Sequence, residues 1–245
     1  MLANATDNFG SLRWPELTSG TLIRRYKRFL ADVMLDDGRT VTAHCPNSGS
    51  MMGCSEPGRK VYLSTHDNPS RKHRYTWELI RMPASLVGVN TLVPNRLVEV
   101  SARSGLVPEL AGYEDIRPEV KYGTNSRIDL LLNGGRKKCY VEIKNCTLVE
   151  SGRAFFPDAV TSRGLKHLEE LQAEVRGGNR AVMFFLIQRM DAVGFSPASH
   201  IDPAYSSELK KAVGGGVEVL CYDTAIDLES IRLRGPVPVS LGRPS

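Results

Sequence analysis

The residues of this sequence whose types and spacing could do chemistry lie in the stretch Ser126–Asn145. Two runs rich in Ile, Leu, Val and Tyr flank an Asn-Gly-Gly turn signal there, and this pattern predicts a β-hairpin. Side chains alternate along a strand, so Glu142 and Lys144 leave the second strand on one face, and an even-numbered loop places Asp129 on that face too. Two carboxylates and an ammonium would then meet among core residues, where charge requires a compensating partner.

A hard divalent cation would be such a partner. Asp129 and Glu142 carry the oxygen ligands that Mg²⁺ or Mn²⁺ prefers, and the backbone carbonyl of Ile143 is a third candidate ligand. Lys144 could then orient or help deprotonate an attacking water and offset charge on a phosphate, which predicts phosphodiester hydrolysis. The same short spacing also occurs in structural Asp/Glu/Lys clusters at strand ends, so the hairpin alone leaves both interpretations open.

Length and composition indicate an ordinary globular protein. A chain of 245 residues can bury a full core and suits one large domain or two ordinary ones. No apolar run reaches membrane-spanning length, and the N-terminus lacks the basic and apolar regions of a signal peptide. The five cysteines form no CxxC pair, which argues against a zinc site or a disulfide framework. We therefore expect a soluble cytoplasmic protein with reduced thiols.

The elements before the hairpin suggest an N-terminal arm, residues 1–20, and a small β-barrel, residues 21–83. Short strand-like runs separated by turn signals are typical of such a barrel. The runs are Leu22–Leu35, Thr40–His44, Lys60–Ser64 and Tyr75–Met82. Between them, Cys45–Met51 is a loop of small residues whose amides could hold an anion, or which could be a plain turn. Pro83-Ala84-Ser85 is the expected domain boundary.

The barrel region carries most of the positive charge. Residues 1–88 hold 12 Lys and Arg against 8 Asp and Glu, which is +4 of the net +5. Cations alternate with aromatic rings in Arg24–Phe29 and again in Arg71–Trp77, as phosphates and unstacked bases require. The alternative is a barrel whose rings fill its core. The candidate nucleic-acid contacts here are Arg24, Arg25, Tyr26, Lys27, Arg28, Lys72 and Trp77.

Residues 84–245 predict an α/β domain around the hairpin. The expected elements are a helix from Pro94, strands at Glu119–Gly123 and in the hairpin, a loop at Phe155–Asp158, a helix over Thr161–Arg176, a buried strand Ala181–Ile187, a helix capped by Asp202-Pro203, and Val217–Tyr222 as the last clear strand. Glu119 is a candidate further metal ligand, or a surface acid at a strand edge. Lys121, Arg163, Lys166 and His167 are candidate nucleic-acid contacts, the last three near the start of a helix, where its dipole also favours phosphate.

Several ordered motifs carry a family resemblance. They are Leu22–Phe29, Cys45–Gly49, Glu119–Gly123 with Ser126–Asp129, Val141–Asn145, and Phe156–Thr161 with Arg163-Gly164 and His167-Leu168. Together they closely resemble the sugar fermentation stimulation protein A family across nearly the whole chain. The resemblance implies an OB-fold domain followed by a PD-(D/E)XK nuclease-like domain, nucleic-acid binding, and bacterial or archaeal origin. It also implies that Asp129 and Glu142 are metal ligands and that Lys144 is the catalytic lysine.

Three functions follow from these patterns. The first is a Mg²⁺- or Mn²⁺-dependent nuclease acting on DNA or RNA, which an intact Asp, Glu and Lys set favours. The second is a DNA-binding regulator of sugar-metabolism genes that keeps a nuclease fold without cutting, although the sequence has no helix-turn-helix signature. The third and weakest is a sugar-phosphate-binding protein, for which no Gly-rich phosphate loop is present. The sequence is compatible with a monomer or a homodimer.

Overall fold

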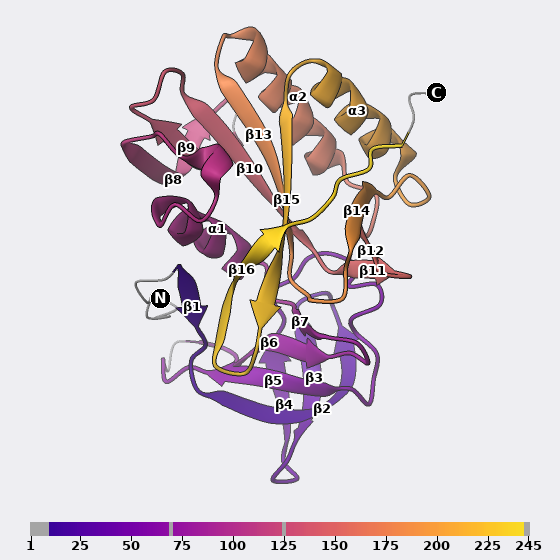
Figure 1. The fold of residues 1–245 in the computed structure, drawn as a ribbon. Coiled ribbons are helices and arrows are strands. Elements are labelled where there is room, and N and C mark those ends of the chain that lie inside the picture. Colours follow the sequence, from indigo (N-terminus) through magenta and orange to yellow (C-terminus); the bar gives the residue numbers. More distant parts are fainter. Residues whose placement is uncertain (1–9, 69–70, 124–125, 243–245) are drawn as a thin grey trace.

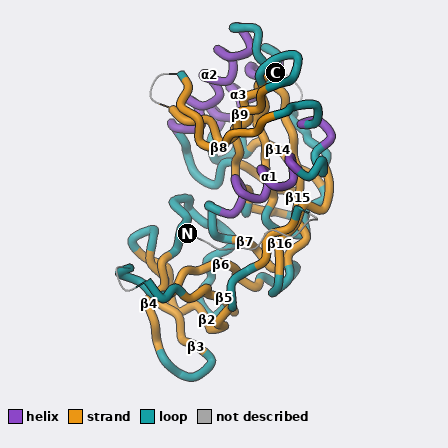
Figure 2. The backbone as a smooth tube through the Cα atoms, turned by 90° about the vertical axis from the view of Figure 1, so that its left-hand side faces the viewer, coloured by secondary structure: helices purple, strands orange, loops and turns teal. Residues whose placement is uncertain are grey.

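The computed structural model describes residues 10–68, 71–123 and 126–242, and these form a β-barrel joined to an α/β domain. Figure 1 shows the barrel below and the α/β domain above it, and Figure 2 shows the same two parts after a quarter turn. The predicted fold class is confirmed, with a small closed β-barrel before a mixed α/β domain. The domain boundaries expected from the sequence stay predictions.

The barrel domain is a six-stranded sheet, of which the first five strands close into a barrel and the last extends the sheet beyond the closure. Its strands are β2 (Leu17–Tyr26), β3 (Leu30–Leu35), β4 (Thr40–His44), β5 (Lys60–Thr65), β6 (Tyr75–Arg81) and β7 (Leu86–Gly88). The sheet order is β4-β3-β2-β5-β6-β7, and an additional parallel pairing of β4 with β6 closes the barrel. Apolar side chains that alternate along these strands, such as Leu22, Val33 and Val61, point inward and are buried.

The prediction of one strand over Leu22–Leu35 is wrong, because the chain turns back within it. Lys27 and Arg28 both have positive φ, 49° and 63°, and they connect β2 to β3 as a hairpin. This left-handed conformation normally favours Gly or Asn, so no turn signal was visible in the sequence. The hairpin places two cations at its tip at a cost in backbone strain.

The α/β domain is built on a seven-stranded sheet of order β1-β16-β15-β13-β10-β9-β8. Its strands are β1 (Ser11–Arg13), β8 (Asp115–Tyr122), β9 (Ser126–Asn133), β10 (Cys139–Cys146), β13 (Arg180–Ile187), β15 (Glu218–Ile226) and β16 (Ser230–Pro236). The central strands β10, β13 and β15 are parallel, and the outer pairings are antiparallel. A second, three-stranded sheet contains β11 (Leu148–Glu150), β12 (Arg153–Phe156) and β14 (Gly194–Pro197).

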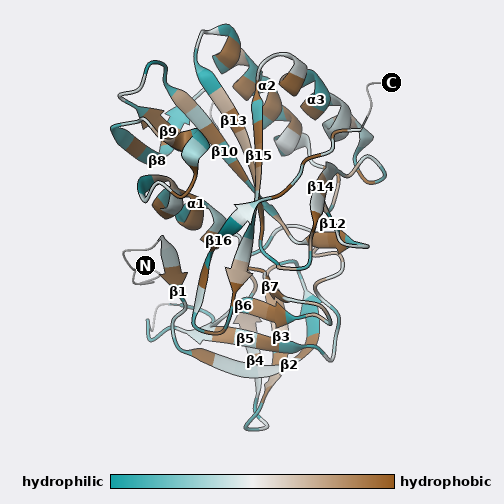
Figure 3. Ribbon diagram, viewed as in Figure 1, coloured by the Kyte–Doolittle hydropathy of each residue, from teal (hydrophilic) through white to brown (hydrophobic). Residues whose placement is uncertain are grey.

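Helices cover both faces of the large sheet. One face packs against α1 (Val93–Arg103) and the segment that holds a short 3₁₀ helix (Pro108–Leu110), and the other against α2 (Ser162–Arg176) and α3 (Pro203–Gly214). Strand β13 is buried along nearly its whole length because both faces are covered, as its apolar sequence predicts. Figure 3 shows hydrophobic residues along the strands of both domains.

Three further sequence predictions need correction in this domain. Val217–Tyr222 is not the last strand, because β16 follows it and pairs with β15 across a bulge after Asp223. Phe155 and Phe156 belong to strand β12 rather than to a loop. Residues Ser11–Arg13 of the expected N-terminal arm form β1, which pairs with β16 at the sheet edge. Within the described residues, no helix is long and apolar enough to cross a membrane.

Candidate active site

The β9–β10 hairpin brings Asp129 beside the start of the ExK segment. The register pairs Leu130 with Val141, and this pairing ends one step before Asp129. There the strands separate, and Asp129 Oδ2 accepts a hydrogen bond of 2.7 Å from the amide of Ile143. Asp129 Oδ1 accepts a second bond of 2.7 Å from Asn95 Nδ2 on α1. Backbone and helix therefore hold this carboxylate in place from two sides.

Glu142 lies deeper and is surrounded by donors. Its Oε1 accepts a hydrogen bond of 2.7 Å from Lys144 Nζ and another from His167 on α2. The side chains of Glu142, His167 and Lys144 are only 3%, 6% and 14% exposed. The predicted convergence of Asp129, Glu142 and Lys144 is thus present, and His167, predicted as a phosphate contact, lies directly against it.

The hydrogen bonds fix the tautomer of His167. Arg163 Nε donates to His167 Nε2 at 3.3 Å, so Nε2 is the unprotonated nitrogen of the neutral ring. The proton then lies on Nδ1 and is donated to Glu142 Oε1. Lys144 Nζ lies 3.0 Å from the same Nδ1, and both groups donate to one carboxylate oxygen. Glu142 Oε1 therefore accepts hydrogen bonds from both Lys144 and His167.

The two carboxylates have opposite electrostatic environments. Burial raises the pKa of Asp129 to about 7, and the neighbouring charge of Glu142 acts in the same direction. Burial also acts to raise the pKa of Glu142, but Lys144 and His167 outweigh it, and the pKa lies below its ordinary value. Glu142 is therefore the carboxylate whose ionised form is favoured, and an added positive charge would favour ionisation of Asp129 most.

The site fits a divalent cation in its donor chemistry. Glu142 Oε2 is buried and has no hydrogen-bond partner among the described residues, an arrangement that is costly unless something else binds it. Asp129 and Glu142 offer two carboxylates, and the described residues contain no group of three His, Cys, Asp or Glu able to hold a metal. A cation here would need backbone oxygen and water to complete its shell, which is usual for Mg²⁺.

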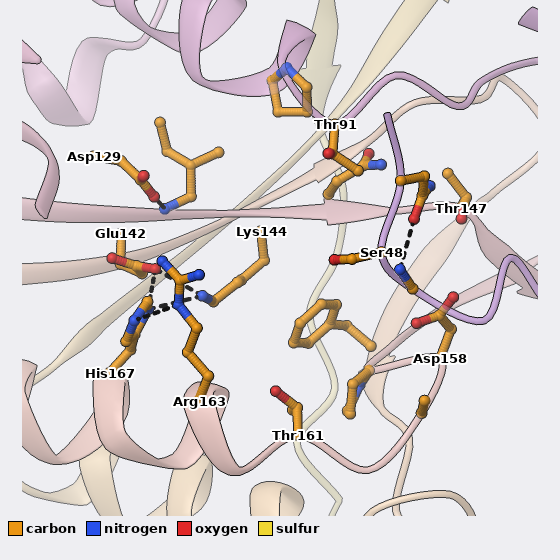
Figure 4. A pocket seen from close by; sticks show the side chains of 18 of the residues that line it. Ser48, Thr91, Asp129, Glu142, Lys144, Thr147, Asp158, Thr161, Arg163 and His167 are labelled. Atoms are coloured by element: carbon orange, nitrogen blue, oxygen red, sulfur yellow. Dashed lines mark hydrogen bonds and ion pairs between the residues drawn. The ribbon is translucent and has the colours of Figure 1, made fainter. Parts of the chain in front are cut away.

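These groups line one end of a cavity of about 430 Å³ between the two domains. Figure 4 shows Glu142, Lys144, His167 and Arg163 gathered at that end, with Ser48 and Asp158 at the other. The barrel contributes Arg28, Asn47, Ser48 and Gly49 to the cavity wall, and the α/β domain contributes Asn145, Phe155, Phe156, Val160 and Thr161 among others. The predicted anion loop, Cys45–Met51, therefore faces the hairpin.

The other predicted nucleic-acid contacts differ in position. The structure contradicts the prediction for Trp77, which is fully buried in the barrel core and donates its indole N–H to the carbonyl of Leu79. Lys72, Lys121 and Arg24 are exposed outside this cavity, and Tyr26 lies outside it and is half-buried. Arg24 and Tyr26 both bond to Asp32. Lys27 is exposed at the tip of the hairpin turn, and Lys166 lies 3.6 Å from Glu170.

Glu119 does not join the carboxylate pair. It is exposed and has a φ of 54°, and the pairing of β8 with β9 skips it, since Pro118 pairs with Leu130 and Val120 with Ile128. The register is the same on both sides of this position, so Glu119 lies across from Asp129, but its left-handed backbone interrupts the pairing there and its side chain is exposed. Glu119 does not line the cavity either.

Sequence reasoning missed Asn95 and Asp158 as site residues. Asn95 directly follows the Pro94 that signalled a helix start, but only packing of that helix against the hairpin reveals its bond to Asp129. Asp158 belongs to the Phe156–Thr161 motif, and its role depends on contact with the barrel, 107 residues earlier in the chain. Neither contact has a signal at short range in the sequence.

Comparisons with known proteins match both domains. Residues 23–89 match the family model described as the SfsA N-terminal OB domain, and residues 92–230 match the Sugar fermentation stimulation protein RE domain. A Sugar fermentation stimulation protein homolog of Geobacter sulfurreducens is 58% identical over 92% of this chain and 97% of its own length, and one of Pelobacter propionicus is 56% identical over 94% and 100%. A solved structure, that of Pyrococcus furiosus SfsA in complex with Ca²⁺, is similar with a TM-score of 0.85 and 28% identity, over 92% of this chain and 96% of that one.

Proposed function

We propose that this chain hydrolyses phosphodiester bonds of nucleic acid with the help of a divalent cation. The chain belongs to the sugar fermentation stimulation protein family. The observation that carries the proposal is the buried Glu142 carboxylate, which has one oxygen held by Lys144 and His167 and the other without a partner among the described residues. A protein that only bound nucleic acid would have no use for this arrangement at the end of a cavity.

Asp129, Glu142 Oε2 and the carbonyl of Ile143 would hold the cation, and Mg²⁺ or Mn²⁺ is the expected metal. The related SfsA of Pyrococcus furiosus was solved in complex with Ca²⁺, which supports divalent binding in this family. When bound, such an ion polarises a phosphoryl oxygen and makes water more acidic. The fixed bonds of Asp129 to Ile143 and Asn95 keep the ligand oxygens in position before the ion arrives.

Lys144 and Arg163 supply the other charges that the reaction needs. The Lys144 ammonium lies against Glu142 and lines the cavity, where it can orient a water and offset charge on a phosphate. Arg163 lines the same cavity and presents an exposed guanidinium, a good partner for phosphate oxygens. Arg28 lines the cavity from the barrel side, so phosphates on both sides of the scissile bond would meet a cation.

The test is cleavage of end-labelled single- and double-stranded DNA and RNA with Mg²⁺, with Mn²⁺ and with chelator. We expect cleavage that requires metal and that falls by about 100-fold or more in Glu142→Gln and Lys144→Met. Glu150→Gln and Lys211→Met are matched controls, because both lie outside the cavity. Selective DNA binding without cleavage under every condition would refute the proposal and support a non-cleaving regulator.

A further inference from the structure

We infer that the substrate reaches this site as a single strand and that paired duplex is excluded. This inference rests on the proposed function, since it concerns the geometry around the same carboxylates. Its basis is a loop of the barrel, residues 46–51, which lines the cavity and is fastened by hydrogen bonds at two places, to the segment that connects the two domains and to Asp158 of the α/β domain.

The first fastening lies beside the start of α1. The carbonyl of Pro46 accepts bonds from the amide and the hydroxyl of Thr91, at 3.1 and 2.7 Å. Asn47 Nδ2 donates to the carbonyl of Val89 at 3.0 Å, and Asn47 is buried. These bonds join the loop to the segment that connects the two domains.

The second fastening crosses to the segment between β12 and α2. Asp158 Oδ2 accepts a bond of 2.8 Å from the amide of Met51, and its carbonyl accepts one of 2.7 Å from Ser50 Oγ. A Cβ at Gly49 would lie only 3.0 Å from both Asp158 carboxylate oxygens, so the loop touches this segment closely. The loop therefore forms a wall that spans from Thr91 to Asp158, and Figure 4 shows Ser48 between them.

Arg25 makes this wall rigid. Its guanidinium donates to the carbonyls of Asn47, Gly49 and Ser50, at 2.8, 2.9 and 3.0 Å. Three bonds from one planar group fix the backbone of the loop. Moving the loop away from the cavity would break these bonds as well as the two fastenings, so the wall is expected to stay in place when a substrate enters.

The space that remains is small beside a nucleic-acid duplex. The cavity of about 430 Å³ has the size of a pocket for a drug-sized ligand, which is the size of one or two nucleotides. A reacting phosphate must come within about 3–3.5 Å of the attacking group, and here it must do so beside side chains that are almost completely buried. A phosphate on a duplex is accompanied by its base pairs and the second strand, whereas a single strand can bend and unstack to enter.

The lining suits the parts of a single strand. Cations from both domains, Arg28 and Arg163, are placed for phosphates. Phe155 and Val160 also line the cavity, and Val160 is 77% exposed, so apolar groups face the same space. Unpaired bases expose apolar faces that pack on such groups, while paired bases keep theirs stacked inside the helix.

The test compares one labelled oligonucleotide as a single strand, as a blunt duplex, and as a duplex with a single-stranded tail, in DNA and RNA versions. We expect the blunt duplex to be cut at least 10-fold more slowly than the single strand, and the tailed duplex to be cut within its tail. Equal rates on blunt duplex and single strand would overturn this inference while leaving the proposed function intact. Absence of metal-dependent cleavage on every substrate would instead overturn the proposed function.

Binding decides the inference independently of cleavage. With Ca²⁺ in place of Mg²⁺ and a fluorescent oligonucleotide, anisotropy should show at least 10-fold weaker binding to blunt duplex than to the single strand, and equal binding would refute the inference. Asp158→Ala removes the bond to Met51 and should reduce the difference in affinity between single strand and blunt duplex. Glu56 forms an exposed salt bridge with Arg59, and Glu56→Ala should leave that difference unchanged. The comparison of single strand with blunt duplex on the wild-type protein tests the inference even if Asp158→Ala folds poorly.

Discussion

The hydrogen bonds around Glu142 predict different effects for replacing His167 by Asn and by Gln. The amide nitrogen of Asn can take the place of Nδ1, and that of Gln the place of Nε2. His167→Asn therefore keeps a donor to Glu142 Oε1, while His167→Gln leaves this oxygen with Lys144 alone. The pair of variants separates a role in holding Glu142 from a role in filling space.

The magnitude follows from the lost bond. A hydrogen bond to a buried charged group contributes about 1.5–3 kcal/mol, and each 1.4 kcal/mol is about tenfold in rate. We expect His167→Gln to lose about 10- to 100-fold in cleavage rate and His167→Asn to lose less than 10-fold. Because His167 holds a predicted metal ligand, the concentration of Mn²⁺ needed for half-maximal activity should rise about 10- to 100-fold in His167→Gln.

The assay measures initial rates on a labelled single-stranded oligonucleotide across a range of Mn²⁺ concentrations and then of substrate concentrations. The substrate KM should change little, since the lost bond acts on the carboxylate and not on the nucleic acid. His66, a barrel histidine that bonds to Thr76, provides matched Asn and Gln controls. Equal losses in His167→Asn and His167→Gln, or a changed KM with an unchanged metal requirement, would refute the reasoning.

Three other predictions concern metal binding, charge and pH. Mn²⁺ at 100 times its Kd should stabilise the protein by about 2.7 kcal/mol, seen as a higher Tm, and Glu142→Gln should abolish this shift; a retained shift would place the metal elsewhere. Arg28→Ala should weaken nucleic-acid binding and reduce its dependence on salt by about one unit of log–log slope in titrations at several salt concentrations; an unchanged slope would show that Arg28 contacts no phosphate. Burial raises the pKa of Glu78, so its stabilising contribution is complete below the ordinary pKa and is lost as pH rises through the folded value. The Tm of Glu78→Gln relative to wild type should therefore increase from pH 4 to pH 8, while exposed Glu229→Gln shows no such trend; a constant difference would contradict the raised pKa.

The sequence alone determined the hairpin and the face that its charged residues share. Alternation along β10 and an even-numbered loop are local properties, and they place Asp129, Glu142 and Lys144 together without knowledge of the rest of the chain. The helix over Ser162–Arg176 and the buried strand β13 were predictable for the same reason, since their apolar periods and their end signals lie within a few residues.

Local signals failed where the backbone adopts a conformation that the residue types disfavour. The turn at Lys27 and Arg28 and the interrupted pairing at Glu119 use positive φ without Gly or Asn, so neither was visible in the sequence. Composition also failed to place Trp77, which is buried in the barrel core. An aromatic ring among cations fits a binding surface and a barrel core equally well, and only the structure shows which face of β6 points inward.

Only the tertiary structure decided what surrounds the carboxylates. His167 was a helix residue near two cations in the sequence, and packing of α2 against β10 made it the donor that engages Glu142. The loop Pro46–Met51 became a wall of the site because Asp158, more than 100 residues later, binds its backbone. Such contacts depend on how two domains meet, and their residues carry no periodic pattern, so sequence gives the chemical groups of this site while packing gives its shape.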